Sequence, residues 1–564
     1  MEIITVKNVS FTYPDADEKV IDDISFTIKE GEFLTIFGAS GSGKTTLLKL
    51  LKKELTPHGT LDGAIYYGST QLDKVEERKL ATDIGYVMQH PDHQIVTDKV
   101  WHELAFGLEN IGVETTEIRR RVGEMANFFG IHHWFHKETQ QLSGGQKQLL
   151  NLAGTMVMQP KVLILDEPTS QLDPIAAAEF IHMLEKINRD LGITIILVEH
   201  DLEEVFPIAD RVLLLDEGKI ILNEQPRHVG TQLKELYPTH AMIEALPTVV
   251  KIFHQLEFTG DCPLTVREGK EALTKNYKND IPSLGKVSVR RTEAPTMLSL
   301  ENIWFRYDKD LPDVLGGVNL SVKKGEIISI LGGNGSGKTT LLNVLAGQYR
   351  AYHGKVTIAE KPLKKYKQKD LYKNLLAVLP QDPQSVFIKS TVKEDYAEIS
   401  KVMGYTKDET AEKTKEVLSQ LGISHLIERH PYDVSGGEQQ KIALGKILLL
   451  EPEIILLDEP TKGIDAFSKL MLRDIIKDLQ AAGKTIIIVT HDIEFAALTS
   501  DRCGLFFDKE IISLDEPTAF FTKNNFYTTM ANRISRHRYE NTITYDEVIK
   551  ICQMNGEKTA NETV

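Results

Sequence analysis

Two glycine-rich segments of the chain have the residue types and spacing that bind the phosphates of a nucleotide. They read GASGSGKTT and GGNGSGKTT, and both fit the pattern G-x-x-x-x-G-K-[ST] after an apolar run. Glycines let backbone N–H groups surround phosphate oxygens, and the N-terminus of the following helix adds a favourable dipole. We expect the lysines to reach the β and γ phosphates of the nucleotide and the next threonine to bind Mg²⁺. The predicted phosphate-binding residues are Gly38, Ala39, Ser40, Gly41, Ser42, Gly43, Lys44, Thr45 and Thr46 in the first segment, and Gly332, Gly333, Asn334, Gly335, Ser336, Gly337, Lys338, Thr339 and Thr340 in the second.

An Asp-Glu pair ends a short apolar run in each half of the chain, in KVLILDE and EIILLDE. Asp166 and Asp458 would place a carboxylate near the metal ion of the phosphate loop, and Glu167 and Glu459 would orient the attacking water. The simpler interpretation is an acidic turn that ends a strand. The neighbouring motifs favour the metal and catalytic roles.

A histidine ends the next apolar run in both halves, in TIILVEH and TIIIVTH. There the side chains of His200 and His491 could touch the γ-phosphate. A lone histidine is more often structural, but these two keep their spacing from the glutamates.

These matches belong to a duplication. Lys44 and Lys338 are 294 residues apart, and the later pairs keep offsets of 291 or 292 residues. Chance does not keep five motifs in register, so the chain contains two copies of one module. The other pairs are Gln89 and Gln381, Ser143 and Ser435, Glu167 and Glu459, and His200 and His491.

The pentapeptide LDEPT occurs a third time, at Leu514 to Thr518, which raises the question of a third site. Glu167 and Glu459 each lie 24 residues after the serine of an SGG segment, whereas Glu516 has no SGG segment at that distance upstream. It also lacks a phosphate loop and a histidine at the matching distance. We therefore predict two sites and assign the third LDEPT to a terminal loop.

Short β-branched runs that alternate with helical stretches predict buried strands of a parallel sheet, with the sites at the carboxyl ends of the strands. The predicted fold class is therefore α/β. We expect the core of the second copy to finish near Asp515 and the last stretch, NGEKTANETV, to be frayed. The predicted domains are residues 1–224, an appended subdomain and linker over 225–296, a second domain over 297–530 and a C-terminal tail over 531–564.

Composition argues against several other classes of protein. Apolar residues make up 41% and charged residues 26% of the 564 residues, as in folded globular proteins. The net charge of −15 argues against binding to a nucleic-acid backbone. Cys262, Cys503 and Cys552 are too isolated for a zinc site or a disulfide framework, which suits a reducing cytoplasm. The N-terminus MEIITVKNVS does not resemble a signal peptide, and no apolar run approaches the ~20 residues that span a bilayer.

The ordered motifs resemble those of ATP-binding cassette (ABC) ATPases: the phosphate loop, Gln89 or Gln381, LSGGQ or VSGGE, LDEP and the strand-ending histidine. The resemblance covers nearly the whole chain. It implies two P-loop NTPase domains in tandem, each a RecA-like core with a helical subdomain, that hydrolyse ATP with Mg²⁺. It implies metal binding by Thr45, Gln89, Asp166, Thr339, Gln381 and Asp458.

In that family two modules close head to tail, so that one module's phosphate loop and the other's SGG segment hold each ATP. The first loop would then face the second copy's SGG segment, and the second loop would face the first copy's. Tyr13 and Tyr307 resemble the aromatic residue that stacks on adenine, although either could instead be a core residue of a β-strand. The SGG residues are Ser435, Gly436 and Gly437 in the second copy, and Ser143, Gly144 and Gly145 in the first.

The second copy departs from the family pattern. Val434 and Glu438 stand where the first copy has Leu142 and Gln146, and its later loop reads KGID in place of SQLD. Because both copies keep the glutamate and the histidine, we expect two hydrolytic sites, with rates that need not be equal.

The stretch HPDHQIVTDKVWHELAFGLENIGV after Gln89 is similar to the ATPases of energy-coupling factor importers, as is PLTVREGKEAL between the copies. This resemblance implies a peripheral subunit at the cytoplasmic face of the cell membrane, with an integral coupling subunit and a substrate-capturing membrane subunit as partners. The second copy loses ELAFGLEN. We therefore predict that Gln89 to Asn110 contacts a cytoplasmic helix of the coupling subunit, the alternative being a generic amphipathic helix.

Other functions stay open at this point. One is the tandem ATPase of a sugar importer, and another is a soluble ABC translation factor. The latter has a highly charged arm between its cassettes, whereas Gln225 to Met297 holds ten Lys/Arg and eight Asp/Glu. A DNA-repair ABC protein would need zinc-type cysteine pairs, and a non-catalytic scaffold would not need both lysines and both glutamates.

Overall fold

The protein is described from a computed structural model of the whole chain. The structure describes residues 1–14, 16, 18–256, 258, 260–277 and 294–561, with side chains up to residue 555. It forms two compact units, Met1–Val250 with Thr259–Leu264 and Lys251–Phe258 with Thr265–Val564, and each is described by itself. Most of the predicted linker KNYKNDIPSLGK lies outside the described residues.

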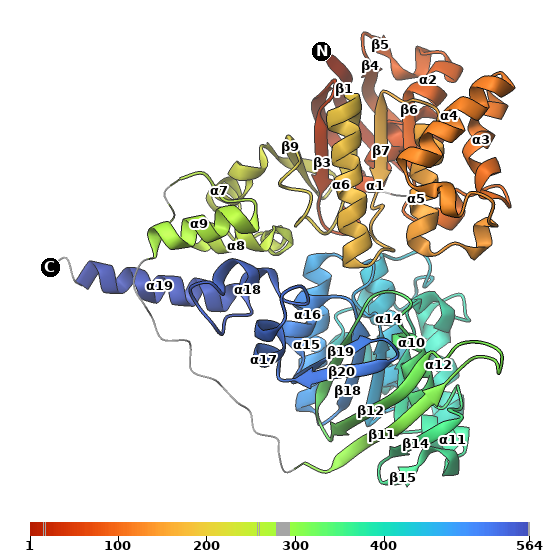
Figure 1. Cartoon of the computed structure of the whole chain (residues 1–564), viewed down its shortest axis with the longest axis vertical. Coiled ribbons are helices and arrows are strands. Elements are labelled where there is room, and N and C mark those ends of the chain that lie inside the picture. Colours follow the sequence, from red (N-terminus) through yellow and green to blue (C-terminus); the bar gives the residue numbers. More distant parts are fainter. Residues whose placement is uncertain (15, 17, 257, 259, 278–293, 562–564) are drawn as a thin grey trace. The chain divides into compact units, whose positions relative to one another are not determined.

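A six-stranded sheet with the order β10-β9-β3-β8-β7-β6 forms the centre of the first unit (Figure 1). All neighbours in it are parallel except β10, which runs antiparallel to β9. Alternate residues of β3 pack into two separate cores, Leu34 and Ile36 into one and Phe33 into the other, so both faces of the strand are covered. The strands are β3 (Phe33–Phe37), β6 (Ile84–Val87), β7 (Val162–Asp166), β8 (Thr194–Val198), β9 (Arg211–Asp216) and β10 (Lys219–Glu224).

A smaller antiparallel sheet and a group of helices complete the first copy. The sheet has the order β2-β1-β4-β5. Helices α3, α4 and α5 pack together as a helical subdomain. The bounds are β1 (Glu2–Thr12), β2 (Ile21–Lys29), β4 (Thr60–Tyr67), β5 (Thr70–Gln71), α1 (Lys44–Leu50), α2 (Glu77–Asp83), α3 (Val100–Asn110), α4 (Thr115–Phe128), α5 (Gly144–Met156) and α6 (Pro174–Leu191).

The second unit repeats this plan, with sheets ordered β16-β17-β18-β13-β19-β20 and β12-β11-β14-β15. The predicted α/β class and the two tandem modules are therefore confirmed. Its strands are β11 (Thr296–Phe305), β12 (Leu315–Lys323), β13 (Ile327–Leu331), β14 (His353–Ile358), β15 (Lys361–Pro362), β16 (Leu376–Leu379), β17 (Ile454–Asp458), β18 (Thr485–Thr490), β19 (Arg502–Phe507) and β20 (Glu510–Asp515). Its helices are α10 (Lys338–Leu345), α11 (Gln368–Tyr372), α12 (Val392–Met403), α13 (Lys407–Gln420), α14 (Gly436–Leu448), α15 (Ala466–Ala481) and α16 (Ile493–Thr499).

The prediction of a terminal loop at the third LDEPT is wrong. Its first two residues end strand β20, and Pro517 begins helix α17 (Pro517–Lys523). The first copy makes the same turn, where β10 ends at Glu224 and Pro226 begins α7 (Pro226–Leu236). Proline suits the first helical position because its fixed φ fits the helix and its missing N–H has no partner there. The third LDEPT is thus a strand-to-helix turn.

The predicted C-terminal tail is a folded helical subdomain. Helices α17, α18 (Met530–Ser535) and α19 (Tyr545–Asn561) bury Phe520, Phe521 and Ile534, so apolar packing continues well past Asp515. NGEKTANETV continues α19 as far as Asn561, and 562–564 lie outside the described residues.

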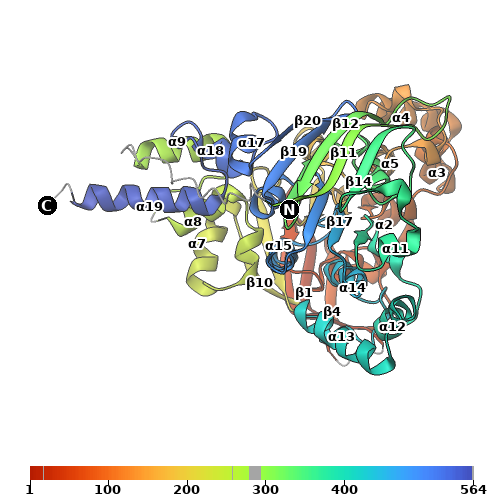
Figure 2. The same ribbon diagram turned by 90° about the horizontal axis from the view of Figure 1, so that it is seen from below.

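The region between the copies contributes a related pair of helices, α8 (Thr248–Gln255) and α9 (Val266–Asn276). Thr265 accepts a hydrogen bond from the Glu268 backbone at the start of α9, as Thr544 does from Glu547 near the start of α19. The duplication therefore extends into the appended helices. Helix α9 lies beside α18 (Figure 2), where Thr274 Oγ1 and His537 Nε2 are 3.0 Å apart. Among the described helices, none is both long enough and apolar enough to cross a membrane.

Candidate active sites

A phosphate loop joins the central strand to a helix in each copy: β3 to α1 in the first and β13 to α10 in the second. Gly43 and Gly337 precede these helices with φ of 100° and 115°, a conformation that side chains other than glycine rarely adopt. A Cβ at Gly43 would lie 2.7 Å from the Val20 carbonyl oxygen. These glycines let the chain turn sharply into the helix N-terminus.

The lysines of both loops lie inside the loops. Lys44 is only 5% exposed and donates to the carbonyl oxygens of Gly38 at 2.9 Å and Ala39 at 2.8 Å. Lys338 donates in the same way to Gly332 and Gly333, at 2.8 and 3.1 Å. Each ammonium is thus positioned in its loop, as expected of a group that binds a phosphate.

A serine with a buried hydroxyl group in each loop also fits a phosphate. The hydroxyls of Ser42 and Ser336 have no hydrogen-bond partner among the residues that the structure describes. A buried hydroxyl without a partner is unfavourable in water-excluded surroundings. Phosphate oxygens would satisfy it.

The predicted metal-binding pairs are in place. Thr45 Oγ1 lies 3.1 Å from Asp166 Oδ1, and Thr339 Oγ1 lies 3.1 Å from Asp458 Oδ1. Two oxygens that bind one Mg²⁺ at adjacent octahedral positions are about 3 Å apart, so both pairs fit this ion. Across the described side chains, no three His, Cys, Asp or Glu residues form a metal-binding group, so any Mg²⁺ here would also need phosphate or water oxygens.

Burial controls the protonation of these aspartates. Burial and the neighbouring charge of Glu167 raise the pKa of Asp166 to about 6, and burial with Glu459 does the same for Asp458. Only the first copy adds Tyr86, whose hydroxyl donates to Asp166 Oδ2 at 3.1 Å. The second copy has Val378 at the corresponding place.

The two glutamates predicted to be catalytic follow their strands in a strained backbone conformation. Glu167 and Glu459 have φ of 45° and 48°, uncommon for any residue but glycine. Backbone hydrogen bonds to the adjacent strand, from Glu167 to Val198 and from Glu459 to Val489, hold this conformation. Each carboxylate is thereby fixed at the edge of the sheet.

In the first copy two of the predicted site residues contact the carboxylate of Glu167. Gln89 Nε2 donates to Glu167 Oε2 at 2.7 Å, and His200 Nε2 lies 2.8 Å from Glu167 Oε1. Gln89 is thus directed at the glutamate, and its role as a metal ligand stays a prediction.

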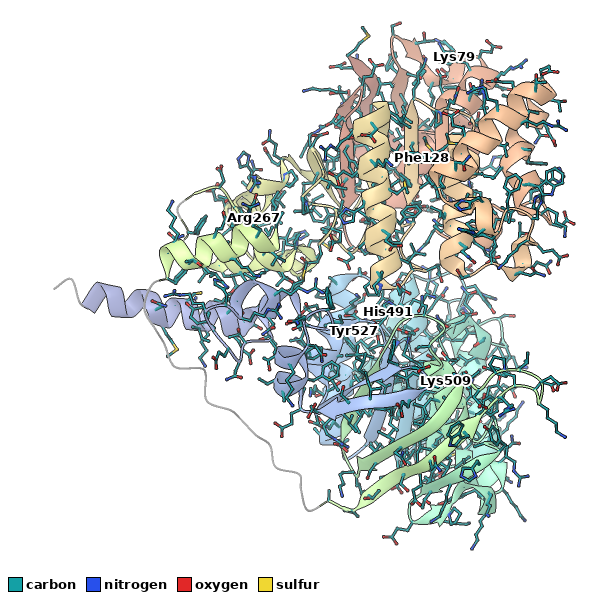
Figure 3. All side chains as sticks on the ribbon, in the orientation of Figure 1. Lys79, Phe128, Arg267, His491, Lys509 and Tyr527 are labelled. Carbon is teal, nitrogen blue, oxygen red and sulfur yellow. The ribbon has the colours of Figure 1, made fainter. Side chains whose placement is uncertain are left out.

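The second copy holds its glutamate differently. His491, labelled in Figure 3, places Nδ1 2.9 Å from Glu459 Oε2 and donates its backbone N–H to that oxygen at 3.1 Å. Lys338 Nζ lies 3.4 Å from Glu459 Oε1, whereas Gln381 is exposed. Although burial opposes ionisation, His491 and Lys338 hold the pKa of Glu459 below its usual value.

Sequence reasoning missed Glu199, which precedes His200 and is 2% exposed. It accepts hydrogen bonds from Thr169 N at 3.0 Å and Thr169 Oγ1 at 2.8 Å, and so ties the turn after Glu167 to the end of β8. Burial raises its pKa to about 8, against the effect of these hydrogen bonds. The second copy has Thr490 there. The only available signal was a carboxylate at the end of an apolar strand.

The two predicted adenine-binding tyrosines lie near the phosphate loops. Tyr13 OH is 3.1 Å from Thr46 Oγ1, and Tyr307 OH is 2.8 Å from Thr340 Oγ1. Tyr13 packs edge to face on Phe11, and Tyr307 packs in the same way on Phe305 although it is 57% exposed. Stacking on adenine stays a prediction for both.

The SGG serines begin helices. Ser143 caps α5 in a reciprocal arrangement with Gln146, and Ser435 caps α14 in the same way with Glu438. In the second copy the Ser435 hydroxyl also donates to Glu438 Oε2 at 2.8 Å. The departure from glutamine to glutamate therefore preserves the cap and adds a negative charge beside the serine. The pairing of each SGG segment with the opposite phosphate loop stays a prediction.

These features define a class of protein: a P-loop ATPase with two nucleotide-binding modules in one chain. The ABC transporter family matches residues 21–170 and 315–462, and the chain belongs to that family. It is an ATPase that binds ATP.

Two relatives align with this chain over nearly its whole length. A Bacillus cereus (strain ATCC 10987 / NRS 248) protein provisionally named an ABC transporter ATP-binding protein is 42% identical over 552 residues, which cover 97% of each chain. A Bacillus subtilis (strain 168) protein provisionally named the HMP/thiamine import ATP-binding protein YkoD is 31% identical over 528 residues, 93% of each chain. Among solved structures, CbiO1 from Clostridium perfringens, titled part of the ABC transporter complex CbiONQ, is 34% identical. It covers 42% of this chain and 96% of its own, with a TM-score of 0.38.

Proposed function

We propose that this chain is the ATP-hydrolysing subunit of an ABC importer of the energy-coupling factor type. It would act as a peripheral subunit at the cytoplasmic face of the cell membrane, with an integral coupling subunit and a substrate-capturing subunit. The observation that carries the proposal is the surface that follows Gln89. The name of the Bacillus subtilis relative, which refers to import of HMP and thiamine, agrees with uptake as the direction of transport.

This surface is apolar and preorganised. Val96 is 66% exposed and Trp101, on α3, is 42% exposed. The Glu103 carboxylate accepts hydrogen bonds from the backbone N–H groups of Val96 and Thr97, at 3.1 and 2.7 Å, which fixes the loop before the helix. An exposed apolar surface on a fixed backbone suits a protein partner.

The same segment joins this surface to the catalytic site. Gln89 donates to Glu167 at one end, while Val96 and Trp101 lie beyond it along the chain. A partner helix that moves this segment would therefore shift a ligand of the catalytic carboxylate. This gives a physical route from hydrolysis to the membrane subunits.

The chemistry proposed for each site is attack of water on the γ-phosphorus of ATP, which breaks its bond to the oxygen shared with the β-phosphate and releases ADP and phosphate. Lys44 or Lys338 would bind the phosphates, Glu167 or Glu459 would orient the water, and His200 or His491 would hold that glutamate. Bound Mg²⁺ would neutralise phosphate charge. A shift from 1:99 to 99:1 between open and closed copies needs about 5.5 kcal/mol of differential binding, which two ATP molecules held between the copies could supply.

Co-purification tests the importer proposal. The tagged chain, extracted with detergent from membranes of its own host, should bring down integral membrane proteins. Trp101→Ala with Val96→Ser should reduce that recovery without lowering ATP binding. The matched control is Val402→Ser, at an exposed place on α12 of the second copy. Recovery of ribosomes in place of membrane proteins would favour the translation-factor alternative.

A further inference from the structure

A strongly basic surface lies on the second unit, away from the residues that bind and hydrolyse ATP. It is built by β15, the short helix η7 (Leu363–Lys365) and α11, and η7 packs against β14. Figure 1 labels β14, β15 and α11 in this part of the second unit. Residues 361–373 contain six lysines and a single acidic residue, Asp370. We call these lysines the lysine surface: Lys361, Lys364, Lys365, Lys367, Lys369 and Lys373, all exposed.

The lysine surface is not neutralised by the protein. Within the described part of the chain, none of its six ammonium groups forms an ion pair with a carboxylate. Lys361 lies over the ring of Tyr366, 4.3 Å from its centroid. The positive charge therefore faces solvent.

The first copy lacks this feature. Its equivalent segment, between β5 and α2, reads TQLDKVEERKLAT, with three basic and three acidic residues. There Lys53 pairs with Glu77 at 3.3 Å. Because the scaffold is the same, the fold itself does not require the lysines of the second copy.

The backbone beneath the lysines is fixed. Tyr366 OH donates to the Ile358 carbonyl at 2.9 Å, Tyr372 OH donates to the Ala346 carbonyl at 2.8 Å, and Leu371 is 3% exposed. The apolar and aromatic side chains thus pack inward and leave the lysines outside. The two tyrosines are not free to stack on nucleic-acid bases.

We propose that the lysine surface binds the anionic headgroups of a lipid bilayer. Lysines without arginine act as point charges and lack the bidentate geometry that selects individual phosphate or base groups. A row of headgroup phosphates at a membrane surface needs only such charges, as in polybasic membrane-binding segments. The inference rests on these charges and not on the proposed importer function.

Vesicle co-sedimentation tests the proposal with the full chain and no membrane subunits. The wild-type protein should bind vesicles that contain phosphatidylglycerol and leave vesicles of phosphatidylcholine alone unbound, and added salt should weaken the binding. Reversal of three charges, Lys364→Glu, Lys365→Glu and Lys367→Glu, should reduce binding at least about tenfold, since each lysine near an anionic surface strengthens binding about fivefold. The ATPase rate in solution should not change.

The control makes the same charge change elsewhere in the second unit. The control variant combines three substitutions at exposed lysines of α12 and α13: Lys401→Glu, Lys407→Glu and Lys415→Glu. It should bind vesicles within about twofold of wild type. Equal binding by the two triple variants would overturn the proposal. So would tighter binding of an oligonucleotide than of the anionic vesicles at one salt concentration, which would assign the surface to nucleic acid. The importer proposal would survive either result.

Discussion

Glu167 and Glu459, the two proposed catalytic glutamates, occupy equivalent places and are held by different neighbours. Glu167 is contacted by Gln89 and His200, whereas Glu459 is contacted by His491 and Lys338. Only in the first copy does a hydrogen bond, from Gln89 to Glu167, link the carboxylate to the segment that leads to the exposed apolar surface. We propose from this comparison that hydrolysis in the first copy is coupled to that surface, and that Gln381 does not take the same part in the second copy.

The largest expected effect comes from removing the catalytic carboxylates. Glu167→Gln and Glu459→Gln should each lower turnover at their own site by about a hundredfold or more, because the water loses the group that orients it. The double variant should retain ATP and release almost no phosphate. Phosphate release and retained nucleotide are measured on the same samples. Turnover of the double variant at the wild-type rate would refute the catalytic assignment.

Replacing Gln89 or Gln381 should affect the hydrolysis rates of the two copies to different extents. Gln89→Ala removes a hydrogen bond to a charged group and should slow the first site about tenfold, whereas Gln381→Ala should change the second site less than about threefold. Each rate is measured with the other site disabled by its Glu→Gln change. Equal effects of the two substitutions would contradict the difference described above.

Glu199 should make the stability of the first unit depend on pH in a way that the second unit, with Thr490 at this place, does not share. Its pKa of about 8 lies above that of an unfolded glutamate, so the native state binds more protons than the unfolded state between about pH 4.5 and 8. Its contribution to stability is therefore present at low pH and is lost as pH rises. Glu199→Gln keeps an acceptor for Thr169 and should gain stability relative to wild type by on the order of 2 kcal/mol from pH 5 to 8.

Chemical denaturation at several pH values measures this gain. The exposed Glu235→Gln is the matched control and should leave the pH slope unchanged. A Glu199→Gln slope equal to that of wild type would show that Glu199 is ionised throughout.

The smallest expected effect is on ATP binding, from substitutions at the residues that cap the helices together with the SGG serines. Glu438→Gln removes a negative charge that holds the Ser435 hydroxyl, and should tighten ATP binding at the first phosphate loop by about twofold to fivefold. The reciprocal Gln146→Glu should weaken binding at the second loop by a similar factor. Nucleotide titration of each variant gives both values, and no change in either would indicate that these residues act only as helix caps.

Much of this arrangement could be predicted from sequence because the reactive residues follow short apolar strands. Parallel strands end at one edge of the sheet, so Lys44, Asp166 and His200 had to gather there. The exposure of the Gln381 side chain, and which histidine nitrogen faces the glutamate, depend on side-chain rotamers, which motif spacing does not reveal. Glu199 was missed because its only signal in the sequence is a carboxylate at the end of an apolar strand. The C-terminal subdomain was missed because α17 and α18 have only seven and six residues, too few to show helical periodicity, and because the longer α19 ends in a polar stretch that is typical of a frayed terminus.

The central claim is that each copy completes the ATP site of the other, and photolabelling with azido-ATP tests it most directly. Arginine at an SGG serine should block the γ-phosphate of the ATP bound to the opposite phosphate loop. With hydrolysis stopped by both Glu→Gln changes, Ser435→Arg should abolish trapping at the first loop and Ser143→Arg at the second, as read from the labelled peptides by mass spectrometry. Loss of label in the copy that carries the arginine, with the other copy unaffected, would contradict the account.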